Sequence, residues 1–195
     1  MATLAELISD TYTLTGRPDL VDETKLAVKQ ATLKLHHSDF YPKDIHETGI
    51  NWSPAAFVQS LPYKSIVPQW RAFKYLRKYA DSVPGAFFTM LTPEESLDRY
   101  AINKDNICYL AGEQIEIRSS TEDEYMLLGC YVHPVLTDEG FSSWLADEHP
   151  YAVIYEAAAN IFKMIGLDEQ AAYMKQTVAE QLQAIKTSQI TGVGY

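Results

Sequence analysis

The chain has 195 residues, of which 47% are hydrophobic, and this length suits one domain with a substantial core or at most two small domains. It lacks an apolar run of the roughly 18 residues that a membrane-spanning helix needs, and its first residues lack a secretion signal, so we expect the protein to fold in the cytosol. With 26 acidic and 16 basic residues, the formal charge of −10 excludes a protein that binds nucleic acid over its whole surface.

Two helices are predicted at the N-terminal end. Residues 3–14 carry apolar residues near one helix face, and Gly16 ends this segment. A second helix is predicted over residues 18–37, because Pro18 suits a first turn and apolar residues recur at helical spacing. The short break between the two helices predicts that they pack as an antiparallel pair.

The segment from about residue 41 to residue 134 is predicted to be rich in strands. Its first half holds five prolines, which exclude long helices. Phe73, Tyr75 and Tyr79 alternate with lysines and are predicted to share one side of a half-buried strand. A short helix is predicted to open at Thr92, a residue type that caps helices well.

The clearest hairpin lies in the second half of this segment. It joins residues 107–110 to residues 113–118 across Gly112, because glycine readily adopts the positive φ that tight hairpins need. Residues 126–132 are apolar on both sides and are predicted to form a central strand.

The last third of the chain is predicted to be helical. A short helical piece is expected over residues 140–146. Pro150 begins a strongly apolar helix over residues 150–165, which ends at Gly166. A final helix over residues 168–187 carries a narrow apolar stripe, as in a helix whose other faces are in water.

Residues 188–195 are predicted to be a flexible C-terminal arm, because they contain two glycines and no helical pattern. Ile190, Val193 and Tyr195 are spaced like the apolar anchors that an extended peptide inserts into a partner. An unstructured end without a role is the alternative interpretation.

Together these elements predict an α+β fold. The N- and C-terminal helices are expected to form a helical bundle with a small antiparallel β layer inserted between them. A single domain is expected to cover residues 1–187, with the extended C-terminal tail beyond it.

The standard catalytic and metal-binding motifs are absent from the sequence, which contains no nucleophile elbow, phosphate loop, His-Glu-x-x-His or Cys-x-x-Cys. We therefore predict that the chain is not an enzyme and uses no catalytic residue, metal ligand or cofactor. Cys108 and Cys130 lie in apolar stretches and are predicted to be buried free thiols rather than a disulfide or redox pair.

Two histidine-containing clusters have a chemical alternative. His36 and His37, followed by Asp39, could ligate a metal, but adjacent helical side chains point about 100° apart, so a role at the helix end is favoured.

The second cluster, Asp147-Glu148-His149, precedes Pro150 and is predicted to cap the following helix. A small hydrolase assembled from dispersed residues such as His46, Asp147 and His149 is the enzymatic alternative.

One basic cluster stands out in this acidic chain. Its residues are Lys64, Arg71, Lys74, Arg77 and Lys78, with aromatic residues between them. Such a pattern can bind single-stranded nucleic acid. An edge strand protected by lysine, or a contact with an acidic neighbouring subunit, is favoured because of the net charge.

Six stretches carry a resemblance to a known family. They are Met1-Ala-Thr-Leu-Ala-Glu-Leu-Ile, residues 32–44, Phe73-Lys-Tyr-Leu-Arg, residues 107–121, Leu128-Gly-Cys-Tyr-Val-His-Pro and residues 149–166. On these stretches, which touch most of the chain, the sequence resembles the head-to-tail adaptor (connector) proteins of short-tailed and related tailed bacteriophages.

The resemblance implies a virion structural protein at the head-to-tail interface, made in the host bacterial cytoplasm. Copies of the chain would form a ring, usually of twelve, beneath the portal and extend the channel through which DNA is ejected. The C-terminal arm with Ile190, Val193 and Tyr195 would bind the portal protein, and a downstream tail or nozzle protein would attach to the ring.

Genomic DNA would pass through this channel without specific binding, because an acidic lining repels it. A tail-completion protein of the virion is the nearest alternative function. A small nucleic-acid-binding protein or an uncharacterised hydrolase is less favoured.

Overall fold

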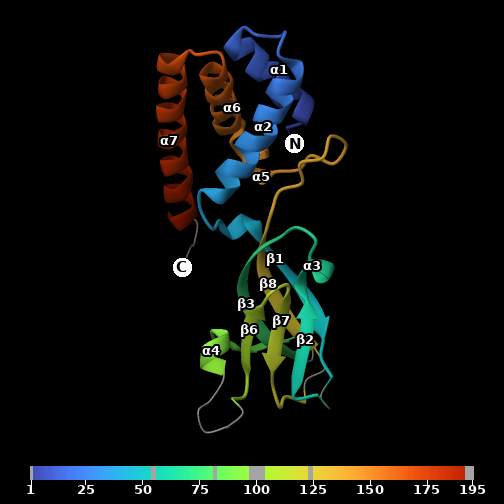
Figure 1. The fold of residues 1–195 in the computed structure, drawn as a ribbon. Coiled ribbons are helices and arrows are strands. Elements are labelled where there is room, and N and C mark those ends of the chain that lie inside the picture. Colours follow the sequence, from blue (N-terminus) through green and yellow to red (C-terminus); the bar gives the residue numbers. More distant parts are fainter. Residues whose placement is uncertain (1, 54–55, 81–82, 97–103, 123–124, 192–195) are drawn as a thin grey trace. The chain divides into compact units, whose positions relative to one another are not determined.

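The structure, a computed structural model, describes residues 2–53, 56–80, 83–96, 104–122 and 125–191. The chain divides into two compact units. The helical unit comprises residues 1–44 and 133–195, and the β unit comprises residues 45–132. The fold is therefore α+β, as predicted (Figure 1).

Helix α1 (Leu4–Thr15) begins at a capping box. The Thr3 hydroxyl accepts a hydrogen bond from the Glu6 backbone N–H (3.2 Å), and the Glu6 carboxylate accepts one from the Thr3 N–H (2.8 Å). Gly16 ends the helix with a φ of 65°, a left-handed conformation that glycine adopts without a steric penalty. The first predicted helix and its end are confirmed.

Helix α2 (Val21–His37) begins three residues later than predicted. The prediction placed Pro18 in its first turn. Instead, the Leu20 N–H bonds to the Arg17 carbonyl (3.3 Å), and Arg17 also pairs with Asp19 (2.7 Å), so these residues form a turn before the helix. With φ −95° and ψ 62°, Leu20 is still outside the helical region.

Three helices follow the β unit along the chain. They are α5 (Trp144–Glu148), α6 (Pro150–Met164) and α7 (Asp168–Thr191). The short helix predicted over residues 140–146 begins only at Trp144, because Ser143 is its N-cap. Helix α6 begins at Pro150 as predicted, and Gly166 follows its end with a φ of 78°.

Helix α7 runs four residues beyond the predicted end at residue 187. The backbone at Ile190 is therefore helical, whereas an arm starting at residue 188 was predicted. Val193 and Tyr195, the other two predicted anchors, lie outside the described residues.

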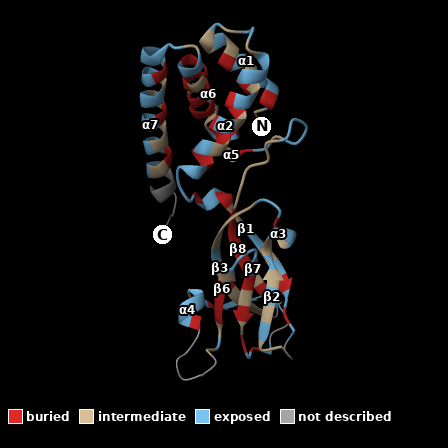
Figure 2. Cartoon of the chain, in the orientation of Figure 1, coloured by how far each residue is buried: buried red, intermediate tan, exposed pale blue. Residues whose placement is uncertain are grey.

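The core of the helical unit is built around α6, which packs against α1, α2, α5 and α7. Ala157, Ala158 and Ala159 are completely buried, and their small side chains let the neighbouring helices approach closely (Figure 2). On α7 the buried residues recur every seven positions, at Ala171, Val178 and Ile185. This is the narrow stripe that the sequence predicted.

The β unit contains two four-stranded sheets. One has the order β1 (Ile45–Asn51), β8 (Tyr125–Val132), β3 (Trp70–Ala80), β4 (Val83–Phe87) and is antiparallel. The other has the order β2 (Val58–Pro62), β7 (Gln114–Arg118), β6 (Ile107–Ala111), β5 (Thr89–Met90), with β5 parallel to β6. Short helices occur at η1 (Pro42–Asp44), α3 (Tyr63–Ile66) and α4 (Pro93–Ser96).

The predicted hairpin and central strand are both confirmed. Strands β6 and β7 pair directly across Gly112, which has a φ of 60°. Strand β8 lies between β1 and β3. Buried side chains from both sheets, among them Leu76, Ile117 and Leu128, join in one core.

The predicted alternation along β3 is confirmed for Tyr75, Lys78 and Tyr79 but is wrong for Phe73. Phe73 pairs with Cys130 and Tyr75 with Gly129, so two residues advance on β3 for one on β8, and Lys74 is the extra residue of a β-bulge. The bulge moves Phe73 to the core side of the sheet, where it packs against the shared core, while Tyr75 is on the other side.

Both cysteines are free and buried, as predicted. Burial raises the pKa of the Cys108 thiol to about 12 and that of the Cys130 thiol to about 11, because the charged thiolate is poorly solvated in the core. Both side chains therefore behave as small hydrophobic residues at neutral pH.

Candidate functional site

A buried polar network joins three segments of the helical unit. The His36 ring at the end of α2 contacts Asp44 Oδ1 through Nδ1 (2.8 Å) and Ser143 Oγ through Nε2 (2.9 Å). The Trp144 Nε1–H donates to the same Asp44 oxygen (2.7 Å). This is the order of contacts found in serine hydrolases, in which a carboxylate orients a histidine that takes the serine proton.

The surroundings of this network are those of a structural element. His36, Asp44 and Ser143 are all buried. The Ser143 hydroxyl also accepts a hydrogen bond from the Ala146 N–H (3.2 Å) and so caps α5. These contacts connect the end of α2, η1 and the start of α5, and only 4% of the Ser143 surface is exposed.

Sequence reasoning missed three members of the network, Asp44, Ser143 and Trp144. It treated His36 and His37 as a pair, but the two rings have different partners, because His37 Nε2 lies 3.1 Å from His133 Nδ1. Among the residues that the structure describes, no three His, Cys, Asp or Glu side chains are arranged to hold a metal ion. No described helix is long and apolar enough to cross a membrane.

The cluster Asp147-Glu148-His149 does not cap α6, and that prediction was wrong. The N-cap residue is His149, and its side chain makes no capping hydrogen bond. Asp147 and Glu148 belong to α5, where Asp147 Oδ1 accepts from the Ala2 N–H (2.7 Å) and Glu148 pairs with Lys43 (2.6 Å). Both side chains therefore project from α5 and bond to other segments, and neither caps α6.

The dispersed residues named for a hydrolase lie in different units. His46 is on β1 of the β unit, whereas Asp147 and His149 are in the helical unit. His149 packs edge-on against Trp144, with ring centroids 6.4 Å apart.

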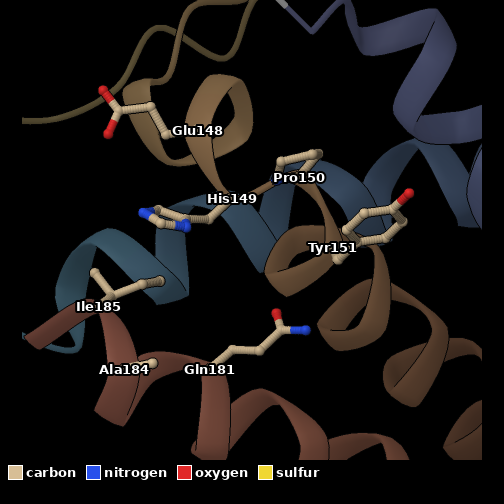
Figure 3. A pocket seen from close by; sticks show the side chains of 7 residues that line it. All are labelled: Glu148, His149, Pro150, Tyr151, Gln181, Ala184 and Ile185. Carbon is tan, nitrogen blue, oxygen red and sulfur yellow. The ribbon is translucent and has the colours of Figure 1, made fainter. Parts of the chain in front are cut away.

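A pocket of about 440 Å³ lies between the start of α6 and the C-terminal half of α7. His149, Pro150 and Tyr151 line one side, and Gln181, Ala184 and Ile185 line the other (Figure 3). The Glu148 carboxylate at its rim points away from the α7 residues. The lining is mostly apolar, so the pocket can seat an apolar side chain.

The structure does not bring the predicted basic cluster together. Lys64, on α3, forms an ion pair with Glu113 in the β6–β7 turn. Lys78 is opposite Met126, on the core side of its sheet, and Arg71 lies at a bulge between the paired positions 70 and 72. Lys74 and Arg77 are associated with the opposite side of the sheet.

That opposite side, the outer face of the sheet β1-β8-β3-β4, carries a group of aromatic and charged residues. Pairing across the strands places Glu47, Tyr75, Arg77, Tyr79, Phe87 and Tyr125 on it. Lys74, in the bulge, has its Nζ 5.4 Å from the ring of Tyr131, another residue of this side. This set is called the outer face below.

Tyr75 lies across the outer face directly over Gly129. Its hydroxyl donates a hydrogen bond to Glu47 on β1, and its ring meets that of Phe87 edge-on, with centroids 5.4 Å apart. Burial and the Glu47 carboxylate raise the pKa of Tyr75 to about 12. The Arg77 guanidinium lies 5.5 Å from the Tyr75 ring and 3.4 Å from Glu47, which ties β1 to β3 across β8.

The Tyr75 arrangement depends on glycine at position 129. A Cβ added there would lie 2.5 Å from the Tyr75 ring. We expect Gly129→Ala to lower the free energy of unfolding by about 1–2 kcal/mol in urea denaturation, because the ring must leave Glu47 and Phe87. Gly49→Ala on β1 is the matched control, since a Cβ there meets nothing within 4 Å.

A double variant identifies the cause. Once Tyr75→Ala has removed the ring, adding Gly129→Ala should cost little more, as expected for two positions that interact directly. A full, additive loss in the double variant would show that Tyr75 is not the reason for glycine at position 129.

No protein-family model matches the chain, and a comparison with curated proteins finds no significant sequence similarity.

Proposed function

We propose that the chain is a virion structural protein that forms a ring beneath the portal of a tailed bacteriophage. In this role it connects the capsid vertex to the tail and extends the DNA channel. Its partners are further copies of itself, the portal protein, a downstream tail or nozzle protein and the DNA that passes through.

The observation that carries the proposal is the way the two units are connected. Helices from both ends of the chain share one core, and the whole β unit is inserted between Asp44 and His133. The strands that enter and leave the insert pair with each other, Ile45 with Tyr131. We interpret the helices as the helical bundle that the resemblance to adaptor proteins implies, and the insert as the β layer that the sequence pattern predicts.

The charge of the chain supports the same role. With a formal charge of −10, copies arranged around a channel would present carboxylates that repel phosphate groups. DNA could then slide through without being held. A tail-completion protein, which also joins rings in the virion, is the alternative within the same class.

Truncation at the C-terminus tests the proposal. Removal of residues 188–195 should abolish binding of the purified chain to assembled portal rings in a sedimentation assay, because the predicted anchors are lost. A second truncation of residues 192–195 alone preserves the full length of α7 and separates the tail from the helix end. Urea unfolding of both variants should match the full chain, so that a loss of binding is not a loss of folding.

Electron microscopy of virus particles gives the independent readout. A phage lacking the gene should produce heads without tails, and the full-length gene supplied from a plasmid should restore tails. Normal tailed particles without the gene would contradict the proposal, and so would portal binding that survives the longer truncation unchanged.

A further inference from the structure

We infer that copies of this chain join head to tail, the outer face of one copy contacting an acidic and apolar end of the helical unit of the next. This inference rests on the proposed ring and assigns the two surfaces that would build it. The outer face supplies aromatic rings and cations. The partner surface supplies aliphatic side chains and carboxylates.

The outer face has the composition of an interface centre. Phe87 is 61% exposed and Tyr125 is 51% exposed, so two large apolar side chains face water on one side of a sheet. Arg77, which also pairs with Glu47, lies over the Phe87 ring, and Lys74 lies over the ring of Tyr131 on the same side of the sheet. Tyr, Phe and Arg are the residue types enriched at protein–protein contacts, whereas an ordinary solvated sheet face alternates to polar residues.

The partner surface lies at one end of the helical unit. The α1–α2 link and the α6–α7 turn are both at this end (Figure 1), and Leu14 of α1 packs against the cluster of Phe162 and Ala171 there. Four large apolar side chains at or near this end are exposed to solvent: Val21, Leu26, Met164 and Leu167. These four residues, together with Asp22, Glu23, Asp168 and Glu169, are called the acidic end.

Carboxylates surround these aliphatic side chains. Asp22 and Glu23 are in the first turn of α2, and Asp168 and Glu169 are in the first turn of α7. Favourable interaction with the helix dipole accounts for acidic residues at these positions. It does not account for Val21 and Leu167, which are exposed next to these carboxylates.

Charge complementarity selects a second copy as the partner of the outer face. The helical unit has 15 acidic and 8 basic residues. At its acidic end, Arg17 is engaged by Asp19 and Lys25 by Asp138 on another segment of the same unit, and Lys163 in the last turn of α6 is exposed. Because the two surfaces differ, each copy can bind one neighbour through each surface, which is a heterologous contact of the kind that builds a ring when its rotation closes.

A photo-crosslink tests the contact directly. The full chain is prepared with p-benzoylphenylalanine at position 87 and irradiated at high protein concentration. We expect covalent dimers in which position 87 is joined to the acidic end, identified by mass spectrometry. The same label at position 64, which pairs with Glu113 away from the outer face, is the control and should give none of these links.

Charge reversal tests the pairing of the two surfaces. Lys74→Glu with Arg77→Glu, or Asp168→Lys with Glu169→Lys, should each reduce the yield of these dimers at least about tenfold, because like charges then meet. A chain that carries both pairs of changes should restore the yield. A mixture of two chains that each carry one of the pairs should restore it too. Lys64→Glu should have no effect.

Arg77→Glu places a second carboxylate beside Glu47 in the same chain and can destabilise the fold. Urea unfolding is therefore measured for every variant. If the double change on the outer face does not fold, Lys74→Glu alone takes its place, because the Lys74 side chain is exposed. Restoration then requires Asp168→Lys in the same chain.

The outcomes separate this inference from the proposed function. Links only within one chain, links to other surfaces, or no restoration by the combined reversals would overturn the head-to-tail contact. If the specific dimers form but the chain is missing from purified particles, the head-to-tail contact is supported and the proposed role in the virion is contradicted.

Discussion

Asp44→Ala should lower the free energy of unfolding by about 3–5 kcal/mol, the largest loss expected from a single polar substitution in this chain. The Asp44 carboxylate accepts hydrogen bonds from both His36 and Trp144, and it is buried. Alanine would leave two donors without this acceptor inside the helical unit. Water cannot replace it without opening the junction of α2, η1 and α5.

Urea unfolding followed by tryptophan fluorescence measures this effect, since Trp144 is itself in the network. Asp39→Ala is the matched control: its ion pair with Lys186 is at the surface, with 45% of the Asp39 side chain exposed, and its loss should cost less than about 1 kcal/mol. Ser143→Ala should fall between the two, at about 1–2 kcal/mol, because it removes a helix cap.

The same variants decide between a structural network and a hydrolase. A structural network predicts that a fluorophosphonate probe leaves Ser143 unlabelled in the folded chain. Labelling that disappears in Asp44→Ala while the fold is retained would instead establish the enzymatic alternative, and the proposed role in assembly would have to be abandoned.

Helices were predicted well where local chemistry decides them. Gly16 after α1, and Pro150 and Gly166 around α6, act through their own backbone, so their effect is visible in the sequence. The start of α2 was misplaced because Pro18 is compatible with both a helix and the turn that forms here. Only the hydrogen bond from Leu20 to Arg17 distinguishes them.

The side of the sheet on which each residue lies was harder to predict than the existence of the strand. The segment that forms β3 was recognised from its aromatic residues, but the bulge at Lys74 reverses the side on which every later residue lies. The basic cluster was expected to act as one surface because its residues are close together in the sequence. The structure keeps Lys74 and Arg77 on one side and places Lys64 and Lys78 elsewhere.

The buried network could not have been predicted from spacing. His36 and Ser143 are separated by 107 positions, and they meet only because helices from both ends of the chain share a core. Gly129 gave no local signal either, since its role depends on a ring from another strand. Such contacts are properties of the tertiary fold, which a single sequence does not display.

Ala157→Leu should be the most damaging apolar substitution considered, with a loss of about 2–3 kcal/mol in the free energy of unfolding. Ala157 has no exposed surface, and α6 is surrounded by α1, α2, α5 and α7. Three added carbon atoms would have to push one of these helices outward. The helices could keep their positions only if the leucine side chain adopted an unfavourable rotamer.

Ala172→Leu on α7 is the control for this prediction. Ala172 is exposed, and alanine and leucine have nearly equal helix propensity, so its stability should change by less than about 0.5 kcal/mol. Equal unfolding midpoints for the two variants would mean that α6 is not tightly enclosed. The shared core of the N- and C-terminal helices, on which the proposed assembly role depends, would then be wrong.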